Sequence, residues 1–277
     1  MSALHESAML VELTISQWTA TRHDKAVSAE VEQQHNATNA GRYNKWLVDR
    51  SLLEPVNKAA TAIRQFHYAK TLPWSDKGAR LLPSRLFMEY RDGLAKLRNA
   101  FEDAANDFRM HYPQAVQQAQ SRLGTMFCQD DYPDAWEIRN AFDIKTDYTP
   151  IPSANDFRLQ IAGEEQDEIK ASVERAVQER QAKALENCYA RLRLLLERIK
   201  EQCAKDTPRI HDSLMGNLRE FLDVLSAFNI TNDPTLIELE NAIRGTVLQN
   251  VDVLRSSSHA RKDTAAATDA ILKRMKR

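Results

Sequence analysis

The chain has 277 residues, of which 43% are hydrophobic and 28% are charged, which is typical of a globular protein with a sizeable core. Its formal net charge of −1 argues against a uniformly basic nucleic-acid binder, although a local basic patch remains compatible with it. The sequence has no apolar run near the roughly 18 residues of a membrane span and no signal-peptide pattern at its start, so we expect a cytoplasmic protein.

The first seventy residues predict one strand and two helices. Residues 10–18 alternate between apolar and polar side chains, as a half-buried strand does. Asp24 is placed to cap a polar helix that ends near His35. Helical sequence resumes over residues 43–69, and because proline inside a helix costs about 3 kcal/mol, we expect a kink or a new start at Pro55.

Residues 67–83, with the sequence HYAKTLPWSDKGARLLP, predict a corner between two helices. Pro73 disfavours helical geometry at Leu72. Trp74 is expected to fold back between the flanking helices, and the Ser, Asp and Gly that follow it are typical of a turn.

The clearest periodic pattern follows this corner. Large apolar residues recur in steps of three and four, which predicts a helix with a partner packed along its length. We expect this helix to span residues 82–112 and a second helix to run from Pro113 to about Met126. The stripe consists of Phe87, Tyr90, Leu94, Leu97, Phe101, Ala104 and Phe108.

Two further segments alternate as strands do, residues 142–148 and 157–161, with a turn-rich connector between them. Together with residues 10–18 they predict one small antiparallel sheet of three strands.

Residues 163–205 contain no proline and predict a helix about 60 Å long at 1.5 Å per residue. We expect it to project, or to pack against the 82–112 helix as an antiparallel arm. Its apolar stripe is Ile169, Val173, Val177, Ala184, Cys188, Leu192, Leu195 and Ile199. Two helices follow, over residues 210–228 and after Asp233, a predicted N-cap ahead of Pro234.

The predicted fold class is therefore mainly α, with long antiparallel, coiled-coil-like helices and one small sheet. We expect a single elongated domain over residues 1–255. Residues 256–277 are basic at their end and poor in large apolar side chains, which predicts a weakly anchored tail with a short terminal helix.

One set of residues fits the pattern of the PD-(D/E)xK nucleases, in which two carboxylates hold a metal ion and a lysine orients the attacking water. The residues are Asp134, Asp143 and Lys145. The polar face of an ordinary strand explains Asp143 and Lys145 equally well, and too few strands are predicted for the nuclease core.

Other patterns have simpler structural explanations. His23 and Asp24 resemble a metal dyad without further ligands, and the acidic run 164–168 suits the first turn of a helix. Cys128, Cys188 and Cys203 are widely spaced and odd in number, which disfavours disulfides and zinc. We therefore predict no enzymatic activity, no metal and no cofactor.

Basic residues mixed with aromatic ones occur in two segments, and this mixture is typical of proteins that grip single-stranded nucleic acid. Buried tryptophans at helix corners and ordinary surface cations are the alternative interpretation. The candidate nucleic-acid-binding residues are Arg42, Tyr43, Lys45, Trp46, Lys70, Trp74, Lys77, Arg80 and Arg85, and the basic residues of the tail would add a nonspecific contact.

The apolar stripe of the predicted 163–205 helix is longer than the 82–112 helix by several turns. Part of this stripe must therefore pack against another element. The C-terminal helices or a second copy of the chain could supply it, and we favour a homo-oligomer. The candidate interface residues are Leu192, Leu195, Leu196 and Ile199.

The segments RHDKAVSAEV, AGRYNKWL, HYAKTLPWSDKGARLLP and FMEYRDGLAKLRNAF resemble a family of helical proteins from tailed phages and related mobile elements. The resemblance covers about residues 10–160. It implies a phage context, and an AAA+ ATPase of the MoxR/CobS type as a candidate partner, because such a gene neighbours some family members. It supplies no catalytic residues.

We therefore predict a non-enzymatic interaction or scaffold protein that contacts an AAA+ ATPase or a host protein and does not enter membranes. Nucleic-acid binding, to single or double strands, is the first alternative, and a metal-dependent nuclease is the second.

Overall fold

The computed structural model describes residues 4–75, 78–153, 163–205 and 208–275. The described residues are 70% helical, with ten α-helices and a small antiparallel sheet, which confirms the predicted mainly α class. It divides into two compact units, where we expected one elongated domain. Unit 1 contains residues 1–12, 68–90 and 147–277, and unit 2 contains residues 13–67 and 91–146.

The larger sheet has the strand order β4-β5-β1-β6. Strands β1 (Ala8–Ser16) and β6 (Asp143–Thr149) are two of the three predicted strands, and predicted strand 157–161 lies outside the described residues. The other two strands are β4 (Leu72–Pro73) and β5 (Arg80–Pro83). Strand β5 pairs antiparallel with β1, from Ala8 opposite Pro83 to Val11 opposite Arg80.

The predicted corner at residues 67–83 is therefore a β-hairpin. Leu72 pairs with Leu81, and the amide of Ser75 donates to the carbonyl of Ala79. Pro73 is tolerated because β4 is an edge strand, where one amide needs no partner. Two very short apolar runs separated by turn residues look the same in sequence as a loop between helices, so the sequence did not reveal the hairpin.

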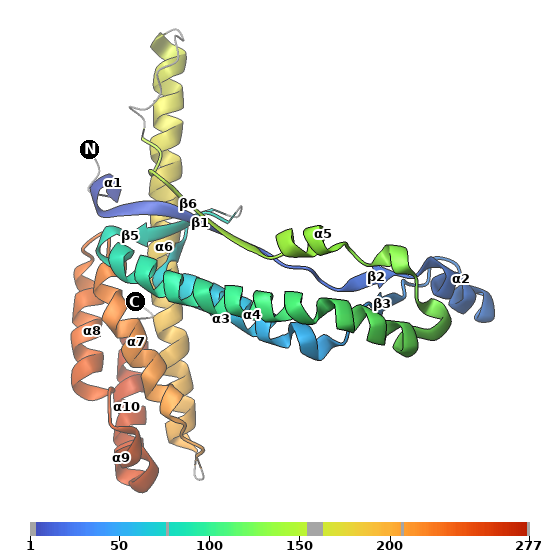
Figure 1. Ribbon diagram of the computed structural model, residues 1–277. Helices are drawn as coiled ribbons and strands as arrows, with labels where there is room; N and C mark the ends of the chain where they lie inside the picture. The colour runs from blue at the N-terminus through green and yellow to red at the C-terminus, as the bar shows by residue number, and fades with distance from the viewer. Residues whose placement is uncertain (1–3, 76–77, 154–162, 206–207, 276–277) are drawn as a thin grey trace. The chain divides into compact units, whose positions relative to one another are not determined.

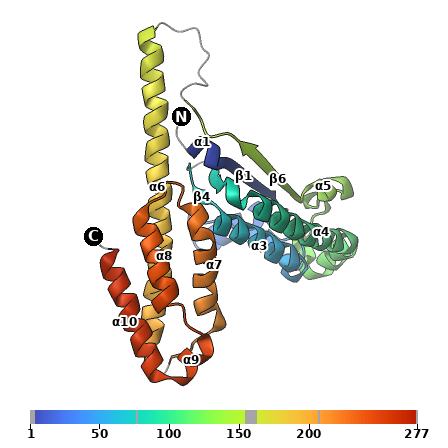
Figure 2. The same cartoon turned by 90° about the vertical axis from the view of Figure 1, so that its left-hand side faces the viewer.

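Unit 1 also contains the short helix α1 (Leu4–Ser7) and the carboxyl-terminal helices. The carboxyl-terminal helices are α6 (Gly163–Ala204), α7 (Asp212–Phe228), α8 (Pro234–Thr246), α9 (Val251–Ser256) and α10 (Ser258–Arg274). Helix α6 packs against α7 and α10 (Figures 1 and 2). Asp233 caps α8 ahead of Pro234, as predicted.

The prediction of a weakly anchored tail at 256–277 is wrong. Ser257 caps α10, and the helix packs along α6 with Thr264, Thr268, Ile271 and Leu272 buried. Small threonines and alanines allow α10 to approach α6 closely, so a stripe poor in large apolar residues still packs well.

Unit 2 begins with a second sheet that the sequence did not predict. Strand β2 (Thr21–His23) pairs antiparallel with β3 (Asn44–Trp46), and helix α2 (Lys25–Gln34) connects them. Asp24 caps α2 through its bond from the Val27 amide, as predicted. The predicted 43–69 helix is thus wrong in its first part: strand β3 and a 3-10 turn, Arg50–Leu53, precede α3 (Glu54–Lys70). Pro55 lies in the first turn of α3, where proline is compatible with a helix.

Helix α4 (Phe87–Leu123) is continuous through Pro113, where we expected two helices. The buried stripe explains this, because it continues past the proline through Tyr112, Ala115 and Ala119. Pro113 itself is exposed, and packing on the buried face offsets its missing amide. Beyond α4, unit 2 contains the 3-10 turns Gly124–Met126 and Gln129–Asp131 and helix α5 (Ala135–Asn140).

The core of unit 2 is aromatic. Phe108 of α4 contacts three rings, those of Trp18, Tyr112 and Phe142, with centroid distances of 5.8, 5.8 and 5.4 Å. Near the start of α4, Gly93 faces the ring of Phe66 on α3 so closely that a Cβ would lie 2.3 Å from its Cζ. The apolar stripe of α4 in this unit therefore packs against aromatic rings from several elements. We had expected it to pack against one long partner helix.

Candidate interaction surface

The carboxyl-terminal part of α6 is anchored inside unit 1. Its buried residues recur every three or four positions from Ala184 to Cys203. Polar contacts reinforce this packing: Tyr189 donates to the carboxylate of Asp233 at 2.7 Å, and Arg193 donates to the carbonyl of Met275 at 3.0 Å.

Most of the predicted oligomer interface lies within this packing. Leu192, Leu196 and Ile199 each have 0% exposed surface, because α7 and α10 cover them. Leu195 is partly exposed and lines a pocket. The prediction of these four residues as a free interface is therefore wrong for the three that are buried. The stripe did need a cover, but helices of the same chain supply it.

The uncovered part of α6 is at its other end. From Glu165 to Ala176, which we call the exposed α6 segment, no side chain is buried. Figures 1 and 2 both show the amino-terminal part of α6 extending beyond the ends of α7, α8 and α10. The segment carries four acidic and two basic side chains. Ile169 and Val173, one turn apart, are its partly exposed large apolar residues.

The candidate nucleic-acid residues of unit 2 differ in accessibility. Lys45 is buried, with 6% of its surface exposed, and cannot meet a ligand without rearrangement. Arg42 is exposed, and Tyr43 and Trp46 are 43% and 39% exposed. The guanidinium of Arg50 lies over the Trp46 ring at 4.6 Å from its centroid.

Lys45 is the centre of a charge cluster that joins three segments of unit 2. Its ammonium lies 2.8 Å from Asp131 and 3.2 Å from Asp24, and donates to the carbonyl of Met126 at 2.7 Å. Burial alone would lower the pKa of Lys45, but the two carboxylates outweigh it and raise the pKa. The pKa of Asp24 is lowered, first by the Val27 amide and further by Lys45. The sequence placed Lys45 in a binding surface, whereas its role here is structural.

The candidate residues of unit 1 also serve the fold. Trp74 is buried, in line with the alternative interpretation of a buried tryptophan, and the guanidinium of Arg180 of α6 lies 5.8 Å from its ring centroid. Lys70 pairs with Glu89 at 2.6 Å. Arg85 is exposed, and Lys77 lies outside the described residues.

Arg80 and Arg191 together bind the end of α3, and no pattern in the sequence indicates this role for Arg191. Arg80 donates to the hydroxyl and the carbonyl of Thr71 at 2.7 and 3.1 Å. Arg191 donates to the carbonyls of Tyr68 and Thr71 at 2.8 and 3.3 Å. Burial, with the nearby Arg191 charge, lowers the pKa of Arg80 to about 10. Cations at the carboxyl end of a helix complement its dipole.

The nuclease-like residues have other partners. Asp134 accepts from the amide of Glu137 at 2.7 Å in a capping box that starts α5. Asp143 and Lys145 are exposed on β6 and lie 3.7 Å apart. This matches the polar strand face that we weighed against the nuclease interpretation, so the arrangement lends no support to a metal site.

Metal-ligating side chains do not converge in the part of the chain that the structure describes, since it contains no group of three or more His, Cys, Asp or Glu suited to an ion. His23 is within hydrogen-bonding distance of Ser28 at 3.1 Å. In the acidic run at the start of α6, Asp167 lies 3.7 Å from Lys170. Cys188 and Cys203 are buried, and burial raises the pKa of the Cys188 thiol to about 12.

Within the described residues, none of the helices combines the length and the apolar character that spanning a bilayer requires. No protein-family model, curated protein or solved structure matches the chain. The resemblance to phage proteins therefore stays a prediction, and the evidence on function comes from the chain's own surfaces.

Proposed function

We propose that the protein is a non-enzymatic interaction or scaffold protein that self-associates through the exposed α6 segment. The observation that carries this proposal is the contrast along one helix. Residues from Ala184 onward are anchored by α7 and α10, whereas residues 165–176 contain no buried side chain. A helix segment without buried side chains contributes little to the core of unit 1, and its side chains are accessible to a partner.

The anchored half lets the segment stay helical. Starting a helix is the costly step, and an isolated helix of twelve residues is marginal in water. Here the segment continues a helix that is already formed and packed. A partner therefore meets an ordered surface, and little conformational entropy remains to be lost on binding.

A second copy of the chain is the partner that we favour. Covering the partly exposed Ile169 and Val173 would remove apolar surface from water, at about 25 cal/mol per Å². The mixture of acidic and basic side chains around them suits antiparallel contact between two identical helices. An AAA+ ATPase or a host protein is the further partner that the phage-protein resemblance implies, and a cytoplasmic location belongs to this proposal.

Light scattering of the purified protein at micromolar concentration tests self-association. We expect a mass above that of the monomer, and the monomer mass for Ile169→Glu/Val173→Glu. Leu194→Glu is the control, because Leu194 is on the anchored half of α6 and is already 68% exposed. A monomeric wild type, or equal loss of assembly in the control, would contradict the proposal.

Nucleic-acid binding is the second candidate function, and the exposed cluster of Arg42, Tyr43, Trp46 and Arg50 favours it. Aromatic faces beside arginines provide stacking and phosphate contacts for single strands. Gel shifts with single- and double-stranded DNA at two salt concentrations test it. Affinity should fall steeply with salt, and Trp46→Ala should weaken single-strand binding by about tenfold, since stacking contributes about 1–3 kcal/mol per base.

A further inference from the structure

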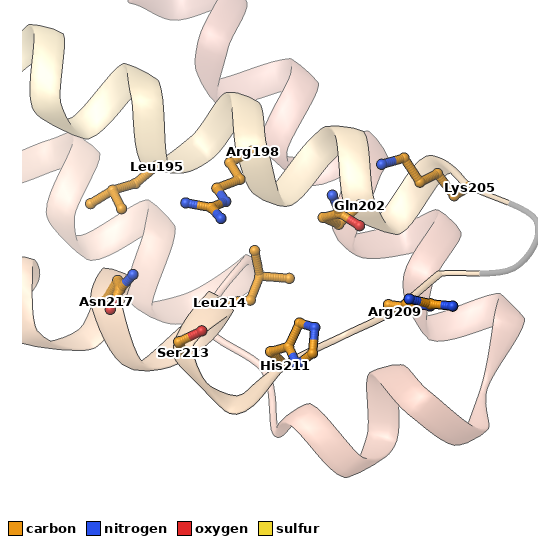
Figure 3. Close-up of a pocket in the computed structure, with 9 residues that line it drawn as sticks. All are labelled: Leu195, Arg198, Gln202, Lys205, Arg209, His211, Ser213, Leu214 and Asn217. Carbon is orange, nitrogen blue, oxygen red and sulfur yellow. The ribbon is translucent and has the colours of Figure 1, made fainter. Parts of the chain in front are cut away.

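A pocket of about 380 Å³ lies in unit 1, between the carboxyl-terminal end of α6 and the start of α7. Figure 3 shows Arg198 and Gln202 of α6 on one side of it, together with Lys205, which directly follows the end of the helix. Arg209, His211 and the first turn of α7 form the other side. The pocket is separate from the exposed α6 segment and from every residue considered above for nucleic acid.

Local sequence explains why polar groups line this pocket. Lys205 directly follows the end of α6. On α6, Leu195, Arg198 and Gln202 follow one another in steps of three and four, so they share one helix face. This face lies beside the buried stripe. In the segment that precedes α7, Ile210 is buried, whereas its neighbours Arg209 and His211 line the pocket.

The pocket is electropositive. None of the described residues that line it is acidic, whereas Arg198, Lys205 and Arg209 are cations. Lys205 is partly neutralised by Glu201 at 3.0 Å. Among the described residues, neither Arg198 nor Arg209 has an ion-pair or hydrogen-bond partner, so both guanidinium groups keep their full set of donors.

The amino end of α7 adds to this field. Helix α7 has 17 residues, and its N-cap residue His211 makes no side-chain capping bond. In contrast, Asp233, Asn250 and Ser257 cap α8, α9 and α10 with their side chains. Among the described residues, the N-cap side chain of α7 therefore accepts from none of the first amides, although the Leu214 amide donates to the His211 carbonyl at 2.9 Å and Asp212 lies in the first turn. Such amides and the helix dipole attract anions.

We propose that this pocket binds a compact phosphate-bearing small molecule, a monophosphate or diphosphate ester with a small apolar part. Arginine forks match the paired oxygens of a phosphate, and the Ser213 hydroxyl adds a donor. This inference goes beyond the proposed self-association and does not depend on it.

Two features favour a small ester over a nucleic-acid strand. The volume is at the lower end of the roughly 300–1,000 Å³ of small-molecule sites. Leu195 and Leu214 supply apolar walls beside the cations, which suits one organic group rather than a repeating backbone.

The test is calorimetric titration of the full chain with inorganic pyrophosphate at constant ionic strength. We expect saturable binding with one site per chain. Arg198→Glu/Arg209→Glu should weaken it at least tenfold, and so should the neutral pair Arg198→Gln/Arg209→Gln. The control is Lys96→Glu/Lys183→Glu, an equal change of charge at exposed positions outside the pocket, which should change affinity less than twofold.

Two further titrations distinguish the ligand class. Succinate, a dicarboxylate, should bind at least tenfold more weakly than pyrophosphate. A twelve-residue single-stranded oligonucleotide should not compete with pyrophosphate for the pocket. Failure of pyrophosphate to bind, equal loss in the control, or binding of the oligonucleotide alone would each overturn the proposal. The thermal unfolding midpoint of each variant without ligand checks that the variant is folded.

Discussion

The ammonium of Lys45 lies 2.8 Å from the carboxylate of Asp131, although the two residues are far apart in sequence. Lys45 is on β3, and Asp131 ends a 3-10 turn beyond α4. Since the lysine is 6% exposed and the aspartate 16% exposed, this ion pair is largely withdrawn from water. It fixes the small β2–β3 sheet to the end of the long helix in unit 2.

Replacing Lys45 by Met should therefore destabilise unit 2. The variant leaves Asp24 and Asp131 without their shared cation, and breaking a buried pair in this way costs about 3 kcal/mol. Hydrogen exchange should measure this as faster exchange of the β2, β3 and α2 amides, by about a hundredfold for that free energy. Lys58→Met is the control, because its ion pair with Glu54 is exposed to water and should contribute far less to stability. Similar effects of the two changes would show that the cluster is not structural.

The Lys45 cluster also predicts how the difference in unfolding free energy between wild type and Lys45→Met depends on pH. The pKa of Asp24 is lowered in the folded protein, so its contribution is present above its unfolded value of about 3.8 and is lost as pH falls through the folded pKa. The pKa of Lys45 is raised, so its contribution is present below about 10.5 and is lost as pH rises through the folded value.

We expect the difference in unfolding free energy between wild type and Lys45→Met to be constant from about pH 5 to pH 9 and to shrink below about pH 4. Urea unfolding at a series of pH values measures it. A difference that persists unchanged at pH 2.5 would mean that packing of the lysine stem, and not its charge, stabilises the unit.

Regular periodicity made much of the fold predictable from the sequence. The long helices α4 and α6, strands β1 and β6, and the caps at Asp24 and Asp233 follow from patterns that depend on neighbouring residues alone. The β4–β5 hairpin and the β2–β3 sheet were not predicted, because strands of two to four residues carry too little periodicity to separate them from loops. Context also decided Pro113, whose helix-breaking tendency is outweighed by the buried face around it.

The candidate site was harder to predict than the fold. Sequence identified the apolar stripe of α6 but not which part would be covered, because the cover comes from α10, a helix without large apolar residues over most of its length. Charged residues gave a similar difficulty. Lys45 and Arg80 are typical surface cations in sequence, and only their distant partners, Asp131 and Thr71, show that they stabilise the fold.

Substitution of Gly93 should reveal the close approach of α3 and α4 in unit 2. Alanine normally stabilises a helix by about 1 kcal/mol relative to glycine. Here its Cβ would meet the Phe66 ring, so we expect Gly93→Ala to lower the unfolding free energy by about 1–3 kcal/mol through overpacking. Chemical denaturation measures this change. In a Phe66→Leu background the penalty should shrink or reverse, and an unchanged penalty there would assign the effect to another contact.

The anchoring of α10 gives the last prediction. Ile271 is 4% exposed on the face of α10 that packs in unit 1. Ile271→Ala should lower the free energy of unfolding by about 2–4 kcal/mol, because a cavity would remain in the packed core. Ile237→Ala on α8 is the matched control, since Ile237 is 49% exposed and should lose about 1 kcal/mol or less. Both variants are compared by urea unfolding monitored by circular dichroism. If the carboxyl-terminal segment were the weakly anchored tail that its composition suggests, the two substitutions would have equally small effects, and amides of α10 would exchange as fast in wild type as in Ile271→Ala.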